Sequence, residues 1–446
     1  MKRLALAGIA AAALLAPGLA RAELLPGSAG SPDAALAVAP DGSPQVAFTA
    51  ADGSLALATR SADGVWSSQP LAGLPGANPF VVDLEVAPDG TTVLLAEDRA
   101  SRWLDLAERS AAGIWTVRTV AAAPKNGLLG FGGLALDASG RPWVAYATEL
   151  SSRKTWLRLV HEDAGGRLVG EAVTRAGFPS SEVLPAAQPV ILPNGSVRVL
   201  EAYASSTIEW SRTRSHKDWS GQFVYASSLG SPAGVLRGAS AAGGGVWSAW
   251  TELFPTFDES ELLLTLHRDG EQTTILHTHA FLVSLVADAA GASVAGDDYV
   301  DLLGVRTVYA GLVFDPSGGS LELAGDLKGY AADPAGGRQY LLLGPDGLSW
   351  YRTALTPAAR VQLSATTSGA SFSLSGRVTG AAGGSVELWR ETEAGSELVS
   401  SLPLAADGTF AATDLPPARP LVYRAVYRDP ASGLPVASLV RTVLGA

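Results

Sequence analysis

The chain has 446 residues, 32 of them basic and 43 acidic, which gives a formal net charge of −11. Because binding to nucleic-acid phosphates or to anionic lipid needs clustered Lys and Arg, this balance argues against a nucleic acid or a lipid surface as the partner. The hydrophobic fraction of 47% is ample for packed cores, and the length favours more than one domain unless the chain is a repeat.

The first 22 residues, "MKRLALAGIAAAALLAPGLARA", predict a secretory signal peptide. Two basic residues precede an apolar run, and the small-residue pattern "ARA" ends the segment. The run is shorter than the about 20 apolar residues that a membrane-spanning helix needs. We therefore expect cleavage before Glu23 and a secreted protein, extracellular or at the cell surface, that has no membrane span and is a monomer. Cysteine is absent, so no disulfide can support the fold.

A turn motif recurs between residues 33 and 355. Its variants are "APDG", "DASG", "LPNG", "AAGG", "DAAG" and "DPAG", and successive copies are 45 to 55 residues apart. Repeats of this length are typical of solenoids, propellers and domain arrays. The glycines that close the turns are Gly42, Gly90, Gly140, Gly195, Gly244, Gly291 and Gly336.

The pattern inside each unit predicts four β-strands. "LALDASGRPWVAYA" alternates apolar and polar residues around its turn, which indicates a hairpin, and "SLALATRSADGVWSSQPL" supplies a second one. Four strands in 40 to 50 residues form a propeller blade, so the repeat predicts a seven-bladed β-propeller. We expect Trp66, Trp115 and Trp219, which open the outer strands, to pack between neighbouring blades.

The last unit supplies only three strands before "TPAAR". A closed ring needs a fourth strand there, because a free strand edge invites aggregation. We predict that residues 23–25 add this outer strand and pair with the strand at 348–355.

From about residue 360 the sequence contains about seven short alternating runs separated by Gly, Asp and Pro turns. This predicts an all-β domain, an immunoglobulin-like or fibronectin-like β-sandwich; a compact β-barrel is the alternative. The expected organisation is a signal peptide over 1–22, the β-propeller over 23–357 and the sandwich over 358–446.

The hexapeptide "SADGVW" at 61–66 is similar to a shortened Asp box, and the repeat as a whole resembles uncharacterised secreted bacterial β-propeller repeat proteins with sialidase-like blades. The "ADGTF" turn at 406–410 is similar to turns in the accessory immunoglobulin-like domains of bacterial surface proteins. The resemblance implies the fold. The arginine triad, the Tyr and Glu pair and the acidic Asp of sialidases have no matching residues, and Arg60, Arg109 and Arg158 are expected on a solvated face of the outer strands.

In a propeller, the loops between second and third strands and between blades lie on one face, where ligands gather. Loops there carry three aromatic residues, Phe80, Phe131 and Phe178. Exposed aromatic rings with nearby amides can stack on sugars or hold a peptide. The alternative is that these rings fill gaps between blades.

The same face is expected to carry polar candidates in "TELFPTFDESE", "HTHAF" and "GDDYVD". His277 and His279 are two residues apart and could join nearby carboxylates in a Zn or Ca site, although solvated loop residues are the plainer interpretation. The acidic binding candidates are Asp258, Glu259, Asp297 and Asp298.

These features predict an extracellular binding or surface protein that works without a cofactor and without catalysis, with a carbohydrate or a protein as its ligand. The alternative is a secreted carbohydrate-active enzyme, a sialidase-like glycoside hydrolase. Such an enzyme needs two carboxyl groups about 5 to 9.5 Å apart in one pocket. They would come from Glu149, Asp258, Glu259, Asp297 and Asp298.

Overall fold

The computed structural model describes residues 22–439 except 72, 75–78, 99–101, 126, 150–154, 175–184, 204–205, 213–217, 227–230, 242, 256–259, 272–273, 279, 290, 303–305, 316–318, 354–358, 369–370, 382, 393–394 and 416–421. Every regular element in this part of the chain is a β-strand. Within it, no helix is long and apolar enough to cross a membrane.

Most of the chain forms antiparallel sheets of four consecutive strands. The N-terminal half contains β2 (Ala34–Val38), β3 (Pro44–Thr49), β4 (Leu55–Arg60) and β5 (Trp66–Pro70); β6 (Pro79–Val86), β7 (Thr92–Asp98), β8 (Trp103–Arg109) and β9 (Trp115–Ala122); β10 (Leu128–Leu129), β11 (Gly133–Leu136), β12 (Pro142–Glu149), β13 (Thr155–Glu162) and β14 (Leu168–Ala172); and β15 (Ala186–Ile191), β16 (Val197–Tyr203), β17 (Ser206–Arg212) and β18 (Trp219–Ala226).

Three further sheets follow in the same pattern. Their strands are β19 (Ser231–Ser240), β20 (Val246–Pro255), β21 (Ser260–Arg268) and β22 (Thr274–Thr278); β23 (Ala280–Asp288), β24 (Gly291–Leu302), β25 (Arg306–Phe314) and β26 (Ser320–Ala324); and β27 (Asp326–Ala332), β28 (Arg338–Gly344) and β29 (Gly347–Thr353), joined by β1 (Glu23–Leu24). The glycine that closes each predicted first turn has a positive φ, from 77° at Gly195 to 138° at Gly291. The sequence repeat therefore corresponds to a structural repeat.

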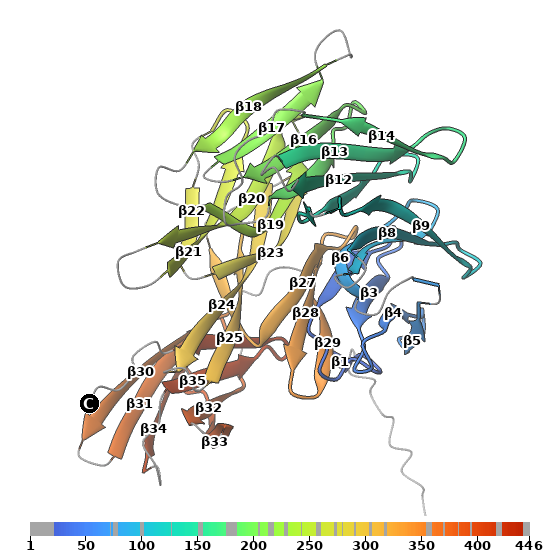
Figure 1. The fold of residues 1–446 in the computed structure, drawn as a ribbon. Helices are drawn as coiled ribbons and strands as arrows, with labels where there is room; N and C mark the ends of the chain where they lie inside the picture. Colours follow the sequence, from blue (N-terminus) through green and yellow to red (C-terminus); the bar gives the residue numbers. More distant parts are fainter. Residues whose placement is uncertain are drawn as a thin grey trace, which may run out of the picture.

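The sheets follow one another with their first strands in contact. β2 contacts β6, and the series continues through β11, β15, β19, β23 and β27, which in turn contacts β2. Clusters of buried side chains fill the spaces between sheets; Leu57 packs with Leu94 in one cluster, and Phe48 packs with Leu341 in another. An all-β, propeller-like arrangement results, and Figure 1 shows the sheets in turn from blue to orange.

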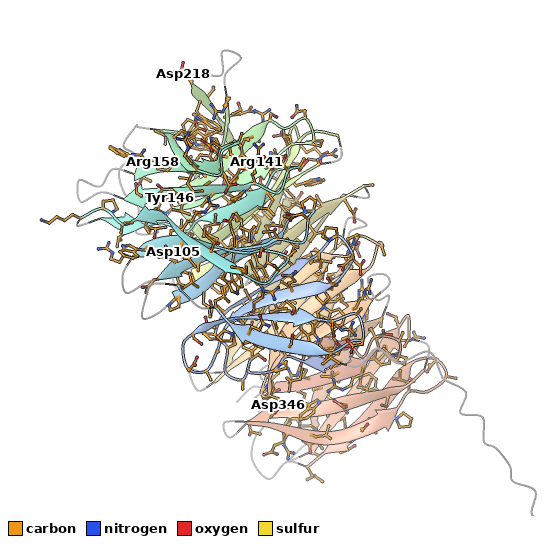
Figure 2. The ribbon with its side chains drawn as sticks, turned by 90° about the vertical axis from the view of Figure 1, so that its right-hand side faces the viewer. Asp105, Arg141, Tyr146, Arg158, Asp218 and Asp346 are labelled. Atoms are coloured by element: carbon orange, nitrogen blue, oxygen red, sulfur yellow. The ribbon has the colours of Figure 1, made fainter. Side chains whose placement is uncertain are left out.

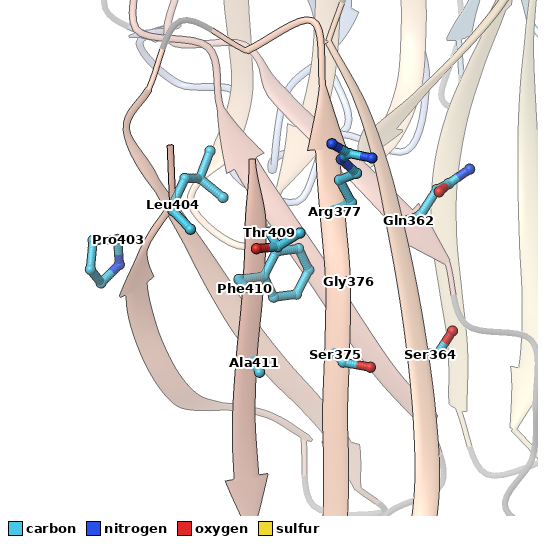
Figure 3. A pocket seen from close by; sticks show the side chains of 11 residues that line it. Gln362, Ser364, Ser375, Gly376, Arg377, Pro403, Leu404, Thr409, Phe410 and Ala411 are labelled. Carbon is cyan, nitrogen blue, oxygen red and sulfur yellow. The ribbon is translucent and has the colours of Figure 1, made fainter. Parts of the chain in front are cut away.

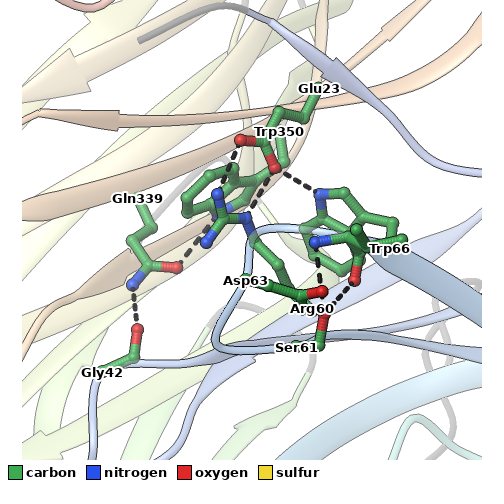
Figure 4. Close-up of polar contacts among 9 residues, drawn as sticks. Glu23, Gly42, Arg60, Ser61, Asp63, Trp66, Gln339 and Trp350 are labelled. Atoms are coloured by element: carbon green, nitrogen blue, oxygen red, sulfur yellow. Dashed lines mark hydrogen bonds and ion pairs between the residues drawn. The ribbon is translucent and has the colours of Figure 1, made fainter. Parts of the chain in front are cut away.

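The predicted N-terminal strand is confirmed. Glu23 lies opposite Trp350 and Leu24 opposite Ser349, so β1 completes the sheet of β27–β29. The guanidinium of Arg60 donates to both carboxylate oxygens of Glu23, at 2.6 and 2.8 Å, and the indole N–H of Trp66 donates to the same carboxylate at 2.8 Å (Figure 4). The first and last parts of the repeat are thus joined by main-chain pairing and by an ion pair.

The expectation of solvated outer arginines is wrong for Arg60, which is half-buried against Glu23. Its guanidinium also lies 5.0 Å from the centroid of the Trp350 ring. Arg158 is likewise half-buried, 5.2 Å over the ring of Trp156, and Figure 2 labels it beside Tyr146 of the neighbouring strand. Long side chains cover apolar surface with their stems, which a charge count does not reveal.

The expected role of the outer-strand tryptophans is confirmed. Trp66 packs against a cluster shared by the β2–β5 sheet and the β27–β29 sheet. Trp115 packs against a cluster shared by the β2–β5 and β6–β9 sheets, and Trp219 against one shared by the β11–β14 and β15–β18 sheets. Each indole buries apolar surface between two neighbouring sheets.

The C-terminal strands form two further layers. A three-stranded sheet has the order β30 (Arg360–Ser368), β31 (Ser371–Thr379), β34 (Thr409–Asp414). The other strands extend the β23–β26 sheet, because β26 pairs with β36 at Leu323 and Val436. These strands are β32 (Ser385–Thr392), β33 (Gly395–Pro403), β35 (Val422–Arg428) and β36 (Pro435–Leu439).

Candidate functional site

A cavity of about 310 Å³ lies between the β6–β9 sheet and the strands that follow it. We call it the loop-face cavity, because residues from the β7–β8 connection and from the connection between the two sheets line it. Its lining residues are Phe80, Glu97, Arg102, Leu128, Leu129, Gly130 and Phe131. It brings together two of the three aromatic residues that the sequence analysis selected.

Phe80 and Glu97 reach the cavity from neighbouring strands. They lie opposite each other in the β6–β7 ladder, so their side chains project from the same face of the sheet. Both side chains are half-buried. The pairing therefore places an aromatic ring next to a carboxylate on one wall.

Phe131 reaches the cavity from the segment between β10 and β11. Its N–H donates to the carbonyl of Pro185, and its own carbonyl accepts from the N–H of Ala187, both at 2.9 Å. Gly130 allows this approach, because a Cβ there would lie 2.2 Å from the oxygen of Pro185. A close contact that only glycine permits thus fixes the position of the Phe131 backbone.

Arg102 contributes the cation of the cavity. Its φ of 64° is positive, and within the described residues it is the one non-glycine residue with such a φ. The backbone is held at both ends, because the N–H donates to the carbonyl of Asp98 at 2.6 Å and the carbonyl accepts from the N–H of Ala123 at 2.8 Å. Strained residues of this kind concentrate at functional sites. Sequence reasoning missed Arg102 and Glu97 because the signal is a backbone conformation and a strand register.

The loop-face cavity combines apolar and polar recognition groups. Aromatic and leucine side chains form most of its wall, and one guanidinium and one carboxylate supply directional hydrogen bonding. An apolar wall with a few polar groups is the usual composition of a small-molecule site. Among the described lining residues, Glu97 is the one carboxylate, whereas glycoside hydrolysis requires a pair of carboxyl groups.

Several predicted site residues lie outside the described residues, namely Phe178, Asp258, Glu259 and His279. His277 lies in β22 opposite Leu264, and Glu149 lies in β12 opposite Leu128; their side chains are not described. Within the described part of the chain, no three His, Asp or Glu side chains come together as metal ligands.

Asp297 and Asp298 lie inside strand β24, whereas the sequence analysis placed "GDDYVD" in a loop. Their exposed fractions are 8% and 1%. Asp297 accepts a hydrogen bond from the N–H of Leu327 at 3.2 Å and so links β24 to the next sheet. Burial, with repulsion from Asp326, raises the pKa of Asp297 to about 9. At Asp297 the strand continues because its carboxylate finds a partner in the next sheet.

A larger groove of about 720 Å³ crosses the C-terminal three-stranded sheet (Figure 3). Gln362, Arg377 and Thr409 are among its polar residues, and Leu404 lies at its side. Phe410 is only 5% exposed and belongs to the core. The described residues that line the groove therefore present no open aromatic ring and no carboxylate.

No family model and no curated protein sequence matches the chain. Among similar solved structures are AofleA from Arthrobotrys oligospora (15% identity, 68% of this chain and 88% of that chain, TM-score 0.43), the SapL1 lectin in complex with alpha methyl fucoside (12%, 66% and 96%, 0.44) and the Aleuria aurantia lectin AAL in complex with Fucalpha1-6GlcNAc (11%, 68% and 96%, 0.44). A puromycin hydrolase mutant is similar at 13% identity, over 78% of this chain and 59% of its own, with a TM-score of 0.47. At these sequence identities and TM-scores, a function for this chain has to be argued from its own residues.

Proposed function

We propose that this protein is an exported binding protein built on a seven-bladed β-propeller with a C-terminal immunoglobulin-like sandwich. The basic and apolar start of the chain supports export, with cleavage before Glu23 and residues 23–357 forming the ring. The cyclic contacts between first strands and the β1–β29 pairing support ring closure. Its site of action is then extracellular or at the cell surface.

The ligand of the ring is a carbohydrate, bound in the loop-face cavity. The observation that carries this proposal is the convergence of Phe80 and Phe131 with Arg102 and Glu97 around one cavity of about 310 Å³. A sugar ring has an apolar C–H face, which packs on aromatic side chains, and hydroxyl groups, which bind planar polar side chains. The cavity offers both kinds of surface at a size suited to a small ligand.

The carboxyl groups that line the loop-face cavity favour binding without catalysis. Both geometries of glycoside hydrolysis use two carboxyl groups, and the described residues that line this cavity supply only that of Glu97. The sialidase-like enzyme proposed as the alternative would need a second acid whose side chain is not described, such as Glu149, Asp258 or Glu259. Product analysis distinguishes the two functions.

The test is a glycan array probed with the mature protein, followed by calorimetry on each glycan bound. Phe131→Ala is expected to weaken binding by about twofold to tenfold, since it removes a stacking surface worth about 0.5 to 1.5 kcal/mol. Phe223→Ala is the matched control, because Phe223 is 65% exposed and lies in β18, outside the cavity lining. Equal affinity of Phe131→Ala and the parent for the glycan would show that the glycan does not bind in the loop-face cavity. Cleavage of a bound glycan would favour the enzyme.

A further inference from the structure

A separate cavity of about 350 Å³ lies where the first strands of four consecutive sheets converge. We call it the axial cavity; residues of β6, β11, β15 and β19 line it, with part of the turn after β6. Each of these strands lies at the end of its sheet, and apart from the bridge between Phe131 and Ala186 of β15, its outer edge pairs with no strand among the described residues. Such edges present N–H and C=O groups, which makes the cavity wall polar.

Arg237 spans the space beside this cavity. It comes from β19, and its guanidinium reaches β6 three sheets away, where Nη2 donates to the carbonyl of Val82 at 3.3 Å and Nη1 lies 3.9 Å from Oδ2 of Asp83. Asp83 also accepts from the N–H of Leu134 at 3.1 Å. The charge of Asp83 is therefore balanced within the protein.

Two other carboxyl groups line the axial cavity, those of Asp137 and Glu85. Asp137 is paired with Arg141, with Nη2 and Oδ2 2.7 Å apart. Among the described residues, Glu85 forms no ion pair. Its side chain is half-buried, and the cavity is the space that it lines. Among the described lining residues, Glu85 is thus the one carboxyl group without an ion-pair partner.

The surroundings of Glu85 oppose its ionisation. Burial raises its pKa, repulsion from Asp83 raises it further, and Arg237 offsets this only in part, so the pKa reaches about 8. A cation placed in the cavity would reverse this balance, because an opposite charge nearby favours the carboxylate.

The part of the wall formed by β15 and β19 is fixed by close packing. The Nε2 group of Gln188, a residue that is 4% exposed, donates to the carbonyl of Leu134 at 2.8 Å. Its buried Oε1 has no donor among the described residues. Gly238 lets β19 approach β15, since a Cβ there would lie 2.5 Å from Cγ2 of Val190. The cavity is therefore a preformed space and not a gap between mobile side chains.

We propose that the axial cavity binds a small organic compound carrying one protonated amine, with Glu85 as the partner of the ammonium group. One carboxyl group without an ion-pair partner, once ionised, matches one positive charge. The apolar residues Val86, Leu136 and Ile191 are also among the lining residues and would border the hydrocarbon part of such a ligand. Backbone groups of the strand edges would accept or donate further hydrogen bonds.

The experiment is calorimetric titration of the mature protein at pH 7 with a panel of amines from methylamine to glucosamine and cyclohexylamine, and with cyclohexanol as the neutral counterpart. Cyclohexylamine is expected to bind about tenfold or more tightly than cyclohexanol, because a hydrogen bond to a charged group adds that much. Glu85→Gln should remove this preference. Glu271→Gln, a change in an exposed ion pair, should keep it.

A second readout is the number of protons that Glu85 releases when the amine binds. At pH 7 Glu85 is mostly protonated, so binding of an ammonium group has to release up to one proton, and the binding enthalpy will differ between phosphate and Tris buffers. Equal affinity for amine and alcohol, an unchanged preference in folded Glu85→Gln, or no binding by any amine at about 10 mM would each overturn the proposal. The measurement does not involve the loop-face cavity, so it stands apart from the carbohydrate test.

Discussion

Glu201 is fully buried in β16, where the indole N–H of Trp210 donates to its Oε2 at 2.9 Å. Burial raises its pKa from 4.5 to about 7, although the Trp210 hydrogen bond works in the opposite direction. The folded state therefore holds the proton more tightly than the unfolded state. The stability that this group contributes is complete below about pH 4.5 and is lost as the pH rises to about 7, a change of about 3 kcal/mol.

Glu201→Gln tests this pH dependence. The amide keeps an acceptor for Trp210 and cannot ionise, so the variant should gain stability relative to the parent between pH 5 and pH 8. The measurement is the melting temperature of both proteins across that range. A difference between them that is the same at both pH values would contradict the assignment, whatever its sign.

Arg102 allows backbone strain to be separated from ligand contact. Arg102→Gly should be more stable than Arg102→Ala by about 1 kcal/mol, because glycine adopts a positive φ without a Cβ clash. Both variants lack the guanidinium and should bind the glycan more weakly. Thermal melts of the two variants measure the strain, and glycan titrations measure the loss of the guanidinium contact. Equal stability of the variants would mean that the backbone at residue 102 carries no strain.

At the scale of elements, third-strand arginines join one sheet to the outer strand of its neighbour. Arg60 of β4 binds Glu23 of β1, and Arg212 of β17 pairs with Glu171 of β14. Leu25 follows β1 and is 2% exposed, and Oγ of Ser28 accepts from the N–H of Leu348 at 2.8 Å. The N-terminal segment thus contributes an ion pair, a ladder and a core residue at one boundary.

Deleting residues 23–30 should lower the melting temperature markedly, because it removes the burial of Leu25, worth about 2 kcal/mol, together with the β1 ladder. Glu23→Gln keeps the strand and weakens only the charged contacts with Arg60 and Trp66, so its effect should be smaller. Differential scanning calorimetry measures both. An unchanged melting temperature after the deletion would rule out a stabilising role for this seam.

At the scale of the whole molecule, the repeat and the C-terminal strands share one core. A single cluster of buried residues contains Leu323 and Tyr340 from the repeat and Leu374 and Val436 from the C-terminal layers. The β26–β36 pairing also continues the sheet from one part into the other. The two parts are therefore joined by packing and by a continuous sheet (Figure 1).

Truncation after residue 357 should therefore destabilise the remainder. It uncovers the edge of β26 and apolar residues such as Leu323, which favours aggregation. The full chain is expected to show one calorimetric transition, and the truncated chain a lower melting temperature. Two independent transitions in the full chain, with the first unchanged by truncation, would contradict this coupling.

Local sequence patterns predicted the strands, the turns and the packing role of the tryptophans, because each depends on nearby residues. Gly42 and its counterparts need a positive φ for a tight hairpin, and alternation indicates which side chains are buried. The N-terminal strand was predicted by strand counting within the repeat. The length of β24 was underestimated, because Asp297 is polar and its burial depends on Leu327 in the next sheet.

What the sequence by itself determined is therefore the repeating all-β unit and the aromatic residues worth testing. What only the tertiary structure decided is which residues meet. Phe80 and Phe131 meet Arg102 and Glu97 around one cavity, and Arg60 meets Glu23. The tertiary structure also places Glu85 in the lining of the axial cavity. Periodicity reports on neighbours along one strand, whereas a site depends on the register and spacing of different sheets. Those are set by packing between residues that are distant in the chain.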